Sequence, residues 1–297
     1  MGVSAVVWYR GVRATARLPF VRANNHHMCG IAGVVSHEPG TRPLSGGTVA
    51  DAMAATMVHR GPDDSGVWQS SSGEVALSHR RLSIIDLSAL GRNPMSLDDR
   101  LWITFNGEIY NFHELRDELQ RAGRRFRSRT DTEVVLAAYD QWGVECVQHF
   151  VGMFAFALWD EPRRRLWLVR DRLGKKPLYY ADSCGTLRFA SELKAILADA
   201  TFPRDLDPAA IRLYLRYGYI PSPHTIYLRA RKLPPGHYLL WEDGRLSVTR
   251  YWDPVPFALA PRLSEAHAEA ELESRLSLAI RQRLIADVPL GAFLSGG

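Results

Sequence analysis

The chain has 297 residues, of which 46% are hydrophobic and 23% charged, an ordinary composition for a soluble globular protein of about two domains. Its formal net charge of +5 falls to +1 from Met28 onward, because residues 1–27 carry four arginines and no acidic residue. A nearly neutral body argues against nucleic acid as a partner, and no apolar run approaches the about 20 residues of a membrane span. Three separated cysteines without metal-site spacing predict a reducing cytoplasm and no metal site.

The first 28 residues stand apart from the rest of the sequence. Residues 3–9 are apolar and the arginines follow them, which is the reverse of the order in a secretory signal. We therefore predict that translation begins at Met28, and that residues 1–28 are an extension or misassigned start absent from the active form. A cleaved leader is the alternative.

The next stretch, residues 28–35, places Cys29 directly after a methionine. A small side chain after an initiator methionine permits its removal, which would leave Cys29 with a thiol and a free α-amine. That amine has a reference pKa of about 7.7–8.0, so it could accept the thiol proton without a histidine partner. Residues 31–35 predict a short buried strand that holds Cys29 at a sheet edge. The alternative is a strand that merely begins with Met-Cys, since free cysteines are among the most buried residues.

Residues 29–200 predict an α+β unit with many short strands and few helices. Its first half predicts a helix at 49–58, a strand at 74–79 and an apolar strand at 101–105. The last of these strands runs into Asn106-Gly107, a pair that alone predicts a hairpin turn.

The second half of this unit predicts two helices and a hairpin. Asn111, with Glu114 three residues on, predicts the N-cap of the first helix, and residues 133–142 predict the second. Residues 153–159 and 165–169 predict the hairpin.

The last third of the chain predicts a different organisation. Residues 201–263 are rich in proline and aromatic side chains and predict a connector with one helix, at 208–217, and a strand pair. Ser264 predicts the cap of a long helix with one apolar face. An apolar strand at 290–294 then runs into a glycine-rich turn.

Several motifs of this sequence occur together in one order: 28–35, 59–66, 106–111, 126–133, 152–157, 170–180, 190–194, 232–237 and 294–297. Together they closely resemble the glutaminase domain of class II glutamine amidotransferases, and among these the glutamine-hydrolysing asparagine synthetases. The resemblance covers Met28 to the last residue. It implies the four-layer αββα N-terminal-nucleophile (Ntn) hydrolase fold over residues 29–200, followed by the beginning of an α/β ATP-pyrophosphatase domain.

The resemblance also implies catalytic roles. Cys29 would attack the side-chain amide of glutamine, with the amide of Asn106 and the backbone N–H of Gly107 as the oxyanion hole. Arg60 would support the loop that carries Cys29. For Asn106-Gly107 the alternative is the ordinary turn, which the following residues 108–111 disfavour.

Substrate glutamine carries an α-ammonium and an α-carboxylate, so its pocket needs charges of both signs. The resemblance assigns Arg81 to the carboxylate, which a guanidinium binds with two parallel hydrogen bonds. Asp131 matches the acid that pairs with the ammonium, and Glu108 is the second candidate. Leu82 and Ile85 complete the implied pocket. For each charged residue the alternative is a solvated surface charge.

The last four residues resemble the start of the Ser-Gly-Gly-x-Asp-Ser pyrophosphate loop of ATP-pyrophosphatase domains, and the resemblance implies that they bind ATP: Leu294, Ser295, Gly296 and Gly297. Glycine-rich turns after strands commonly bind phosphate through backbone N–H groups, although Ser-Gly-Gly alone predicts only a turn. The implied cofactors are ATP and Mg²⁺ for the full-length enzyme and none for the glutaminase half-reaction. Because the Asp and Ser of the loop are absent, we predict a truncated synthetase domain over residues 264–297.

The implied activity is glutamine-dependent asparagine synthesis, that of an asparagine synthase. Ammonia from glutamine would amidate aspartate that ATP has activated as a β-aspartyl-adenylate. We expect this chain to retain at most the glutaminase activity. The alternatives are a family member with another acceptor, such as a peptide or a sugar, and a non-catalytic remnant. A homodimer is compatible with the sequence.

Overall fold

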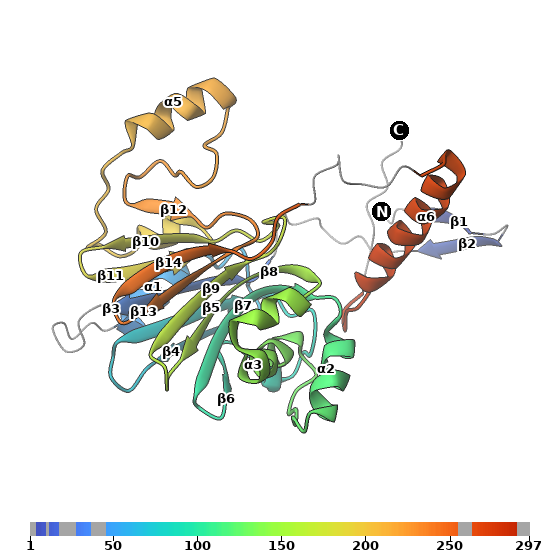
Figure 1. Ribbon diagram of the computed structural model, residues 1–297, viewed down its shortest axis with the longest axis horizontal. Coiled ribbons are helices and arrows are strands. Elements are labelled where there is room, and N and C mark those ends of the chain that lie inside the picture. Colours follow the sequence, from blue (N-terminus) through green and yellow to red (C-terminus); the bar gives the residue numbers. More distant parts are fainter. Residues whose placement is uncertain (1–3, 10–11, 18–27, 37–45, 255–262, 290–297) are drawn as a thin grey trace.

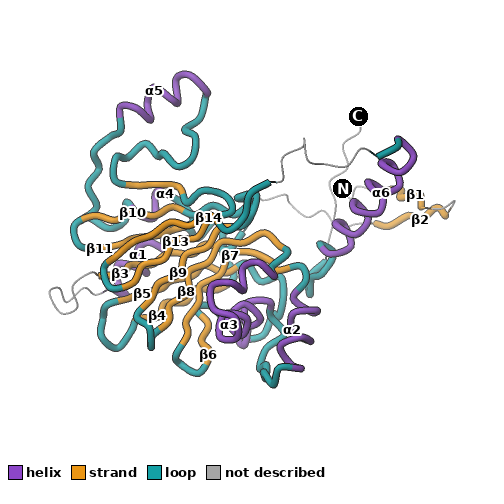
Figure 2. The backbone as a smooth tube through the Cα atoms, in the orientation of Figure 1, coloured by secondary structure: helices purple, strands orange, loops and turns teal. Residues whose placement is uncertain are grey.

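The computed structural model describes residues 4–9, 12–17, 28–36, 46–254 and 263–289. Two six-stranded antiparallel sheets lie face to face at the centre of the molecule (Figures 1 and 2). The first sheet has, in spatial order, the strands β12 (Ala230–Lys232), β10 (Tyr179–Ser183), β11 (Thr186–Ala190), β3 (Gly30–Ser36), β5 (Val75–Arg81) and β4 (Asp64–Gln69). The second has β14 (Arg245–Arg250), β13 (His237–Glu242), β9 (Arg165–Arg170), β8 (Gly152–Asp160), β7 (Leu101–Ile109) and β6 (Met95–Leu97).

Helices cover the outer face of each sheet. The first sheet packs against α1 (Gly46–Ala55) and α4 (Leu193–Ile196), and the second against α2 (Phe112–Arg121) and α3 (Asp131–Trp142). The predicted α+β class and four-layer αββα arrangement are therefore confirmed.

Three hydrophobic cores separate the four layers. Alternation along β3 shows how the sequence builds two of them, because Ile31 packs between the sheets while Ala32 packs under α1. The third core lies between the second sheet and its helices and includes Phe105 and Leu136. This packing fixes the beginning of β3 and the end of β7 next to each other.

Local structure agrees with several of the predicted elements and corrects others. Asn106-Gly107 lies inside β7 rather than in a turn, and the predicted hairpin forms as β8 and β9. Asn111 does not cap α2: its side chain donates to the His149 carbonyl at 3.0 Å and accepts from the Val151 N–H at 2.9 Å. It thereby joins the start of α2 to the chain before β8.

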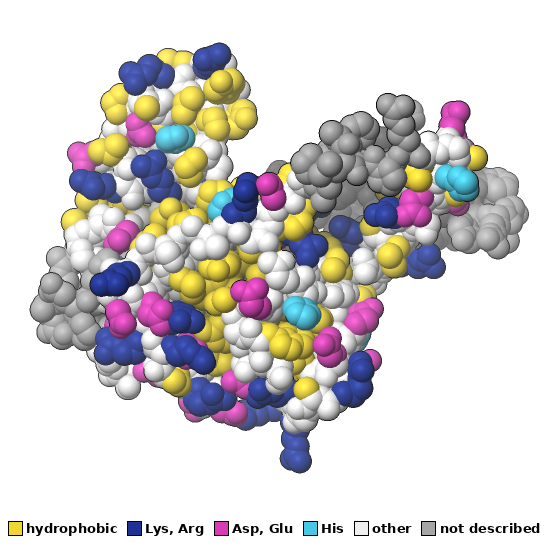
Figure 3. Space-filling view, in the orientation of Figure 1, with side chains coloured by type: hydrophobic (Ala, Val, Ile, Leu, Met, Phe, Trp, Pro, Cys, Tyr) yellow, Lys and Arg dark blue, Asp and Glu magenta, His cyan; other side chains and the backbone are white. Residues whose placement is uncertain are grey.

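The stretch predicted as a connector, residues 201–263, contains the predicted helix, α5 (Pro208–Tyr217), and the predicted strand pair, β13 and β14. Its strands complete the two sheets, with β12 on the edge of the first and β13 and β14 on the edge of the second. Among the described residues of this stretch, the helix α5 stands away from the sheets (Figure 1). Large hydrophobic side chains on and after this helix are exposed and form a yellow patch at the top of Figure 3: Tyr214, Leu215, Tyr217 and Tyr219.

Beyond the sheets, α6 (Glu265–Gln282) begins at the predicted cap, where Ser264 Oγ accepts from the His267 N–H. Its predicted apolar face is exposed over Leu272, Leu276 and Ile280. None of the helices in the described ranges is long and apolar enough to span a membrane. A separate hairpin of β1 (Ser4–Tyr9) and β2 (Val12–Arg17) precedes the sheets in the chain. The predicted strand at 290–294 and the predicted ATP-binding residues 294–297 lie outside the described residues.

Candidate active site

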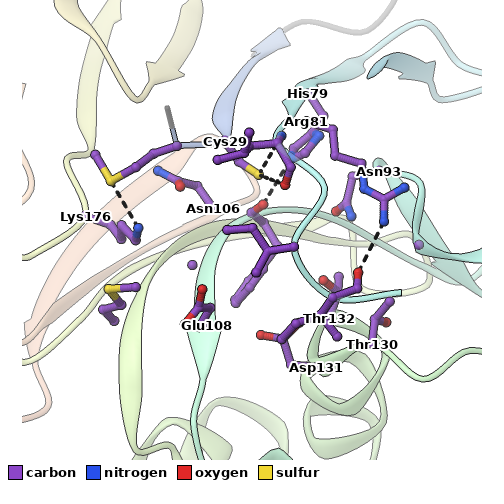
Figure 4. Close-up of a pocket in the computed structure, with 18 residues that line it drawn as sticks. Cys29, His79, Arg81, Asn93, Asn106, Glu108, Thr130, Asp131, Thr132 and Lys176 are labelled. Carbon is purple, nitrogen blue, oxygen red and sulfur yellow. Dashed lines mark hydrogen bonds between the residues drawn. The ribbon is translucent and has the colours of Figure 1, made fainter. Parts of the chain in front are cut away.

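One pocket collects the residues that the sequence predicts for glutamine (Figure 4). It lies where β3 begins, β5 ends and β7 runs past the short strand β6. All eight predicted glutamine-site residues line it: Cys29, Arg81, Leu82, Ile85, Asn106, Gly107, Glu108 and Asp131. The sheet packing thus brings together segments that are separated by up to about a hundred residues in the chain.

Cys29 is fixed on both sides. The Leu82 N–H points at its sulfur at 3.4 Å, and the thiol donates to the Leu82 carbonyl at 3.6 Å. On the other side, Arg60 Nε donates to the Cys29 carbonyl at 3.0 Å while its Nη1 contacts Glu192 at 3.0 Å. The predicted supporting residue Arg60 therefore joins the nucleophile loop to the chain after β11.

The thiol of Cys29 has a raised pKa. Burial is the main cause, and the Leu82 N–H and the positive charges of Lys176 and Arg81 oppose it in part. A thiol with a raised pKa is protonated at neutral pH, so it needs a base before it can act as a nucleophile.

The side-chain amide of Asn106 is buried next to the thiol without a hydrogen bond. It is 1% exposed, and neither its oxygen nor its nitrogen has a partner among the described residues. Buried amides normally find partners, because an unpaired polar group costs about 1–3 kcal/mol. An unpaired amide that lines a pocket is therefore a group whose partner is expected to be a ligand.

The backbone of β7 leaves a second donor at the same place. The Ile109 N–H points away from β8 and donates to Asp131 at 2.9 Å, while the Tyr110 N–H points to β8. Because N–H directions alternate along a strand, the Gly107 N–H points away from β8 as well, beyond the end of β6. A side chain at Gly107 would collide with the Met153 carbonyl, which explains the glycine.

Arg81 holds the loop that follows β5. Its Nη2 donates to the Asp86 carbonyl at 2.5 Å, and its guanidinium passes so close to Gly91 that no side chain fits there. The guanidinium lines the pocket as well, so this loop and the pocket share one cation. Its predicted role toward a carboxylate stays a prediction.

The negative side of the pocket is formed by Asp131 and Glu108. Asp131 begins α3 after the cap residue Thr130, and burial next to Glu108 raises the pKa of Asp131 to about 7. Burial raises the pKa of Glu108 as well. Two carboxyls with raised pKa values, one buried and one half-buried, favour a ligand that brings a positive charge.

Two further ionisable residues, His79 and Lys176, line the pocket, and the sequence motifs give neither of them a role there. His79 Nε2 bonds to the Phe105 carbonyl at 2.9 Å, and burial lowers the pKa of this histidine to about 4. Lys176 is 6% exposed and its ammonium reaches Met28 Sδ at 3.1 Å. His79 lies in the predicted strand 74–79 and Lys176 in the motif 170–180. Nothing in the sequence distinguishes Lys176 from its neighbour Lys175 as the one that faces the pocket.

The segment after α6 also reaches this site. The Asp287 carboxylate accepts from the Asp86 N–H at 2.8 Å, and the Asp287 N–H donates to the Ile84 carbonyl at 2.9 Å. Arg283 lies over the ring of Tyr110, with 4.5 Å between its guanidinium carbon and the ring centroid. The loop held by Arg81 on one side is therefore held by residue 287 on the other.

Comparisons with known proteins agree with this geometry. A family model described as a glutamine amidotransferase domain matches residues 28–252. The chain is 36% identical over 280 residues to asparagine synthetase (glutamine-hydrolyzing) 3 of Bacillus subtilis (strain 168), covering 91% of this chain and 44% of that protein. It is 36% identical over 282 residues to amidase chry2 of Gibberella zeae, covering 91% and 41%. The chain thus spans less than half the length of these two curated relatives.

A solved structure shares the fold. Glutamine phosphoribosylpyrophosphate amidotransferase from B. subtilis, complexed with ADP and GMP, superposes with a TM-score of 0.58 at 18% identity, over 76% of this chain and 50% of that chain. At this level of identity the likeness shows the fold alone. The predicted Ntn fold is confirmed by it together with the two antiparallel sheets.

Proposed function

This chain belongs to the glutamine amidotransferase domain family, and we propose that it hydrolyses glutamine to glutamate and ammonia at Cys29. The observation that carries the proposal is the unpaired, buried amide of Asn106 beside a thiol that is held at 3.4 Å from the Leu82 N–H. Nucleophile and oxyanion donors in one pocket are the requirement for acyl transfer.

The proposed reaction has two halves. The Cys29 sulfur bonds to the amide carbon of glutamine while its proton passes to the α-amine of Cys29. The Asn106 amide and the Gly107 N–H stabilise the oxyanion, and the amine returns the proton to the leaving nitrogen as ammonia departs. Water then attacks the thioester, gives a proton to the same amine, and releases glutamate as the thiol re-forms.

This mechanism requires that Met28 is removed. An amide nitrogen does not accept a proton near neutral pH, so only a terminal Cys29 supplies the base. Met28 also lines the pocket, so its removal would enlarge the space next to the sulfur. His79 is a poor substitute base, because a pKa of about 4 makes it far weaker than a terminal amine.

Substrate recognition follows from the charges of the pocket. We infer that Asp131 and Glu108 receive the α-ammonium of glutamine, and that Arg81 receives the α-carboxylate. The positive charge of the ligand would favour the ionised form of Asp131, whose pKa in the free protein is about 7. Leu82 and Ile85 then flank the aliphatic part of the substrate.

For the whole protein we propose ATP-dependent amidation of aspartate in the cytoplasm, with Mg²⁺ and the ammonia released at Cys29. The name of the Bacillus subtilis relative supports this acceptor. Amidase chry2, which is equally similar over this chain, keeps another acceptor as the second candidate. Incubating the full-length protein with glutamine, ATP and either aspartate or another candidate ammonia acceptor would distinguish the two candidates by the amide that is formed.

Glutamate release from glutamine tests the proposed function. Cys29→Ala should abolish it, whereas Cys146→Ala and Cys184→Ala should leave it within about twofold, because neither residue lines the pocket. Wild-type release from the Cys29 variant would contradict the assignment. No release from any form, with the protein folded, would favour a non-catalytic remnant.

A further inference from the structure

Lys176 is a buried cation in the wall of the active-site pocket with no role in the mechanism above. Its side chain is 6% exposed and points to the same end of the pocket as Cys29 (Figure 4). The neighbouring Lys175 is exposed to solvent. Burying an ammonium group costs free energy, so a buried lysine beside a nucleophile suggests that its charge has a function there.

The backbone around Lys176 is built to hold it there. The Asp171 carboxylate, 1% exposed, accepts from the backbone N–H groups of Leu173, Lys175 and Lys176 at 2.9–3.1 Å. Arg170 Nε donates to the Lys176 carbonyl at 2.9 Å. These contacts fix the turn after β9, and therefore the direction in which the Lys176 side chain leaves it.

The ammonium itself contacts a group that the proposed function removes. Its nitrogen lies 3.1 Å from Met28 Sδ, and a thioether is a weak acceptor. Cleavage of Met28 removes this contact. The α-amine of Cys29, the next residue in the chain, then becomes the N-terminus. Lys176 then faces both the amine and the thiol of the nucleophile.

We propose that Lys176 is a positioning residue whose fixed positive charge keeps the Cys29 α-amine unprotonated and favours the thiolate during attack. This inference rests on the proposed function, because it needs the free amine. A nearby positive charge disfavours a second one on the amine and favours a negative one on sulfur. The resting enzyme then holds a neutral base at neutral pH, where a terminal amine is otherwise mostly protonated.

Other charged groups face the same site and set the balance. Arg81 acts on the thiol in the same direction as Lys176, and Asp131 acts against both. Burial lowers the pKa of Lys176, and Glu108 and Asp171 raise it while Arg60 lowers it. The negative charge of Glu108 therefore helps to keep the Lys176 side chain protonated.

The experiment compares three variants of the chain whose N-terminus is Cys29: Lys176→Met, Lys176→Arg and Lys175→Met. The first readout is the pH profile of kcat at saturating glutamine, where the acidic limb reports the amine in the substrate complex. The second is the pH dependence of Cys29 alkylation by iodoacetamide, followed by mass spectrometry of the N-terminal peptide. The second readout uses no glutamine, so it remains informative if the proposed function fails.

In Lys176→Met we expect both midpoints to move upward by about one to three pH units, the range expected when one nearby charge is removed. Lys176→Arg should restore them, and the exposed control Lys175→Met should behave as the wild type. A uniform loss of kcat in Lys176→Met with both midpoints unmoved would overturn the proposal and assign Lys176 a structural role. Unchanged profiles and unchanged kcat would overturn it as well. If Lys176→Met does not fold, Lys176→Gln provides the same test.

Discussion

Asp131 should make glutamine binding depend on pH in a range where most carboxylates do not titrate. Its carboxyl is buried at the start of α3, beside Glu108, and its pKa is about 7. Below that pH the group takes up a proton, becomes neutral and loses its attraction for the α-ammonium of glutamine. Affinity should therefore be highest above pH 7 and fall as the pH decreases.

The magnitude follows from the fraction of Asp131 that is ionised. With a pKa of about 7, this fraction falls about tenfold between pH 8 and pH 6, so the dissociation constant for glutamine should rise by about the same factor. This corresponds to about 1.4 kcal/mol of binding free energy. The Ile109 N–H, which donates to Asp131 at 2.9 Å, opposes protonation but does not outweigh burial.

Titration calorimetry of the Cys29→Ala chain measures this binding without turnover. Asp131→Asn in the same background should bind glutamine weakly at every pH and lose the dependence below pH 7. Glu114→Gln, at an exposed position of α2, is the matched control and should keep it. The same steep dependence in Asp131→Asn would refute the reasoning and point to Glu108, whose pKa is also raised by burial.

Three further variants test other parts of the site. Asn106→Ala should lower kcat for glutamate release by about 10²–10³-fold with a smaller change in KM, because the oxyanion exists only after attack; a pure KM effect would reassign the residue. Asp287→Ala should raise KM for glutamine about fivefold, because it removes the one hydrogen bond from the Asp86 N–H to the Asp287 carboxylate and leaves the backbone bond to Ile84 in place; unchanged steady-state kinetics would show that the side-chain contact does not matter for binding. Gly91→Ala should lower the free energy of unfolding by about 1–3 kcal/mol in urea denaturation, since the added methyl meets the Arg81 guanidinium; wild-type stability would show that Arg81 moves freely.

Motif order predicted a set of residues that lie together in one pocket, whereas local rules predicted parts of the surrounding elements wrongly. Asn106-Gly107 alone favours a turn, but it lies in β7, where pairing with β8 and the absence of a side chain outweigh the local preference. Asn111 has the pattern of a helix cap, yet the neighbouring chain offers its amide better partners in His149 and Val151. A short window of sequence cannot predict such contacts, because the partners are about 40 residues or more away in the chain.

The sequence predicts a strand pair in residues 201–263, but neither the burial of Lys176 nor the sheets that these strands join could be predicted from it, for a related reason. Lys176 and Lys175 are identical in type and adjacent, so the sequence does not show which of the two side chains the folded turn buries. The proline-rich composition of 201–263 indicates a linker, whereas β12 and β13 pair with strands more than 45 residues earlier, and β14 pairs with β13. Long-range pairing of this kind depends on the whole sheet.

The central claim is that the terminal amine of Cys29 is the base. It is tested most directly with two chains, one that begins at Met28 and one that begins at Met1 and carries a replacement of Met28 that prevents cleavage. Mass spectrometry should find Cys29 at the N-terminus of the first, and only that chain should release glutamate from glutamine. Equal release by the second chain, shown to be intact, would contradict the amine as base and leave His59 and His79 as the next candidates.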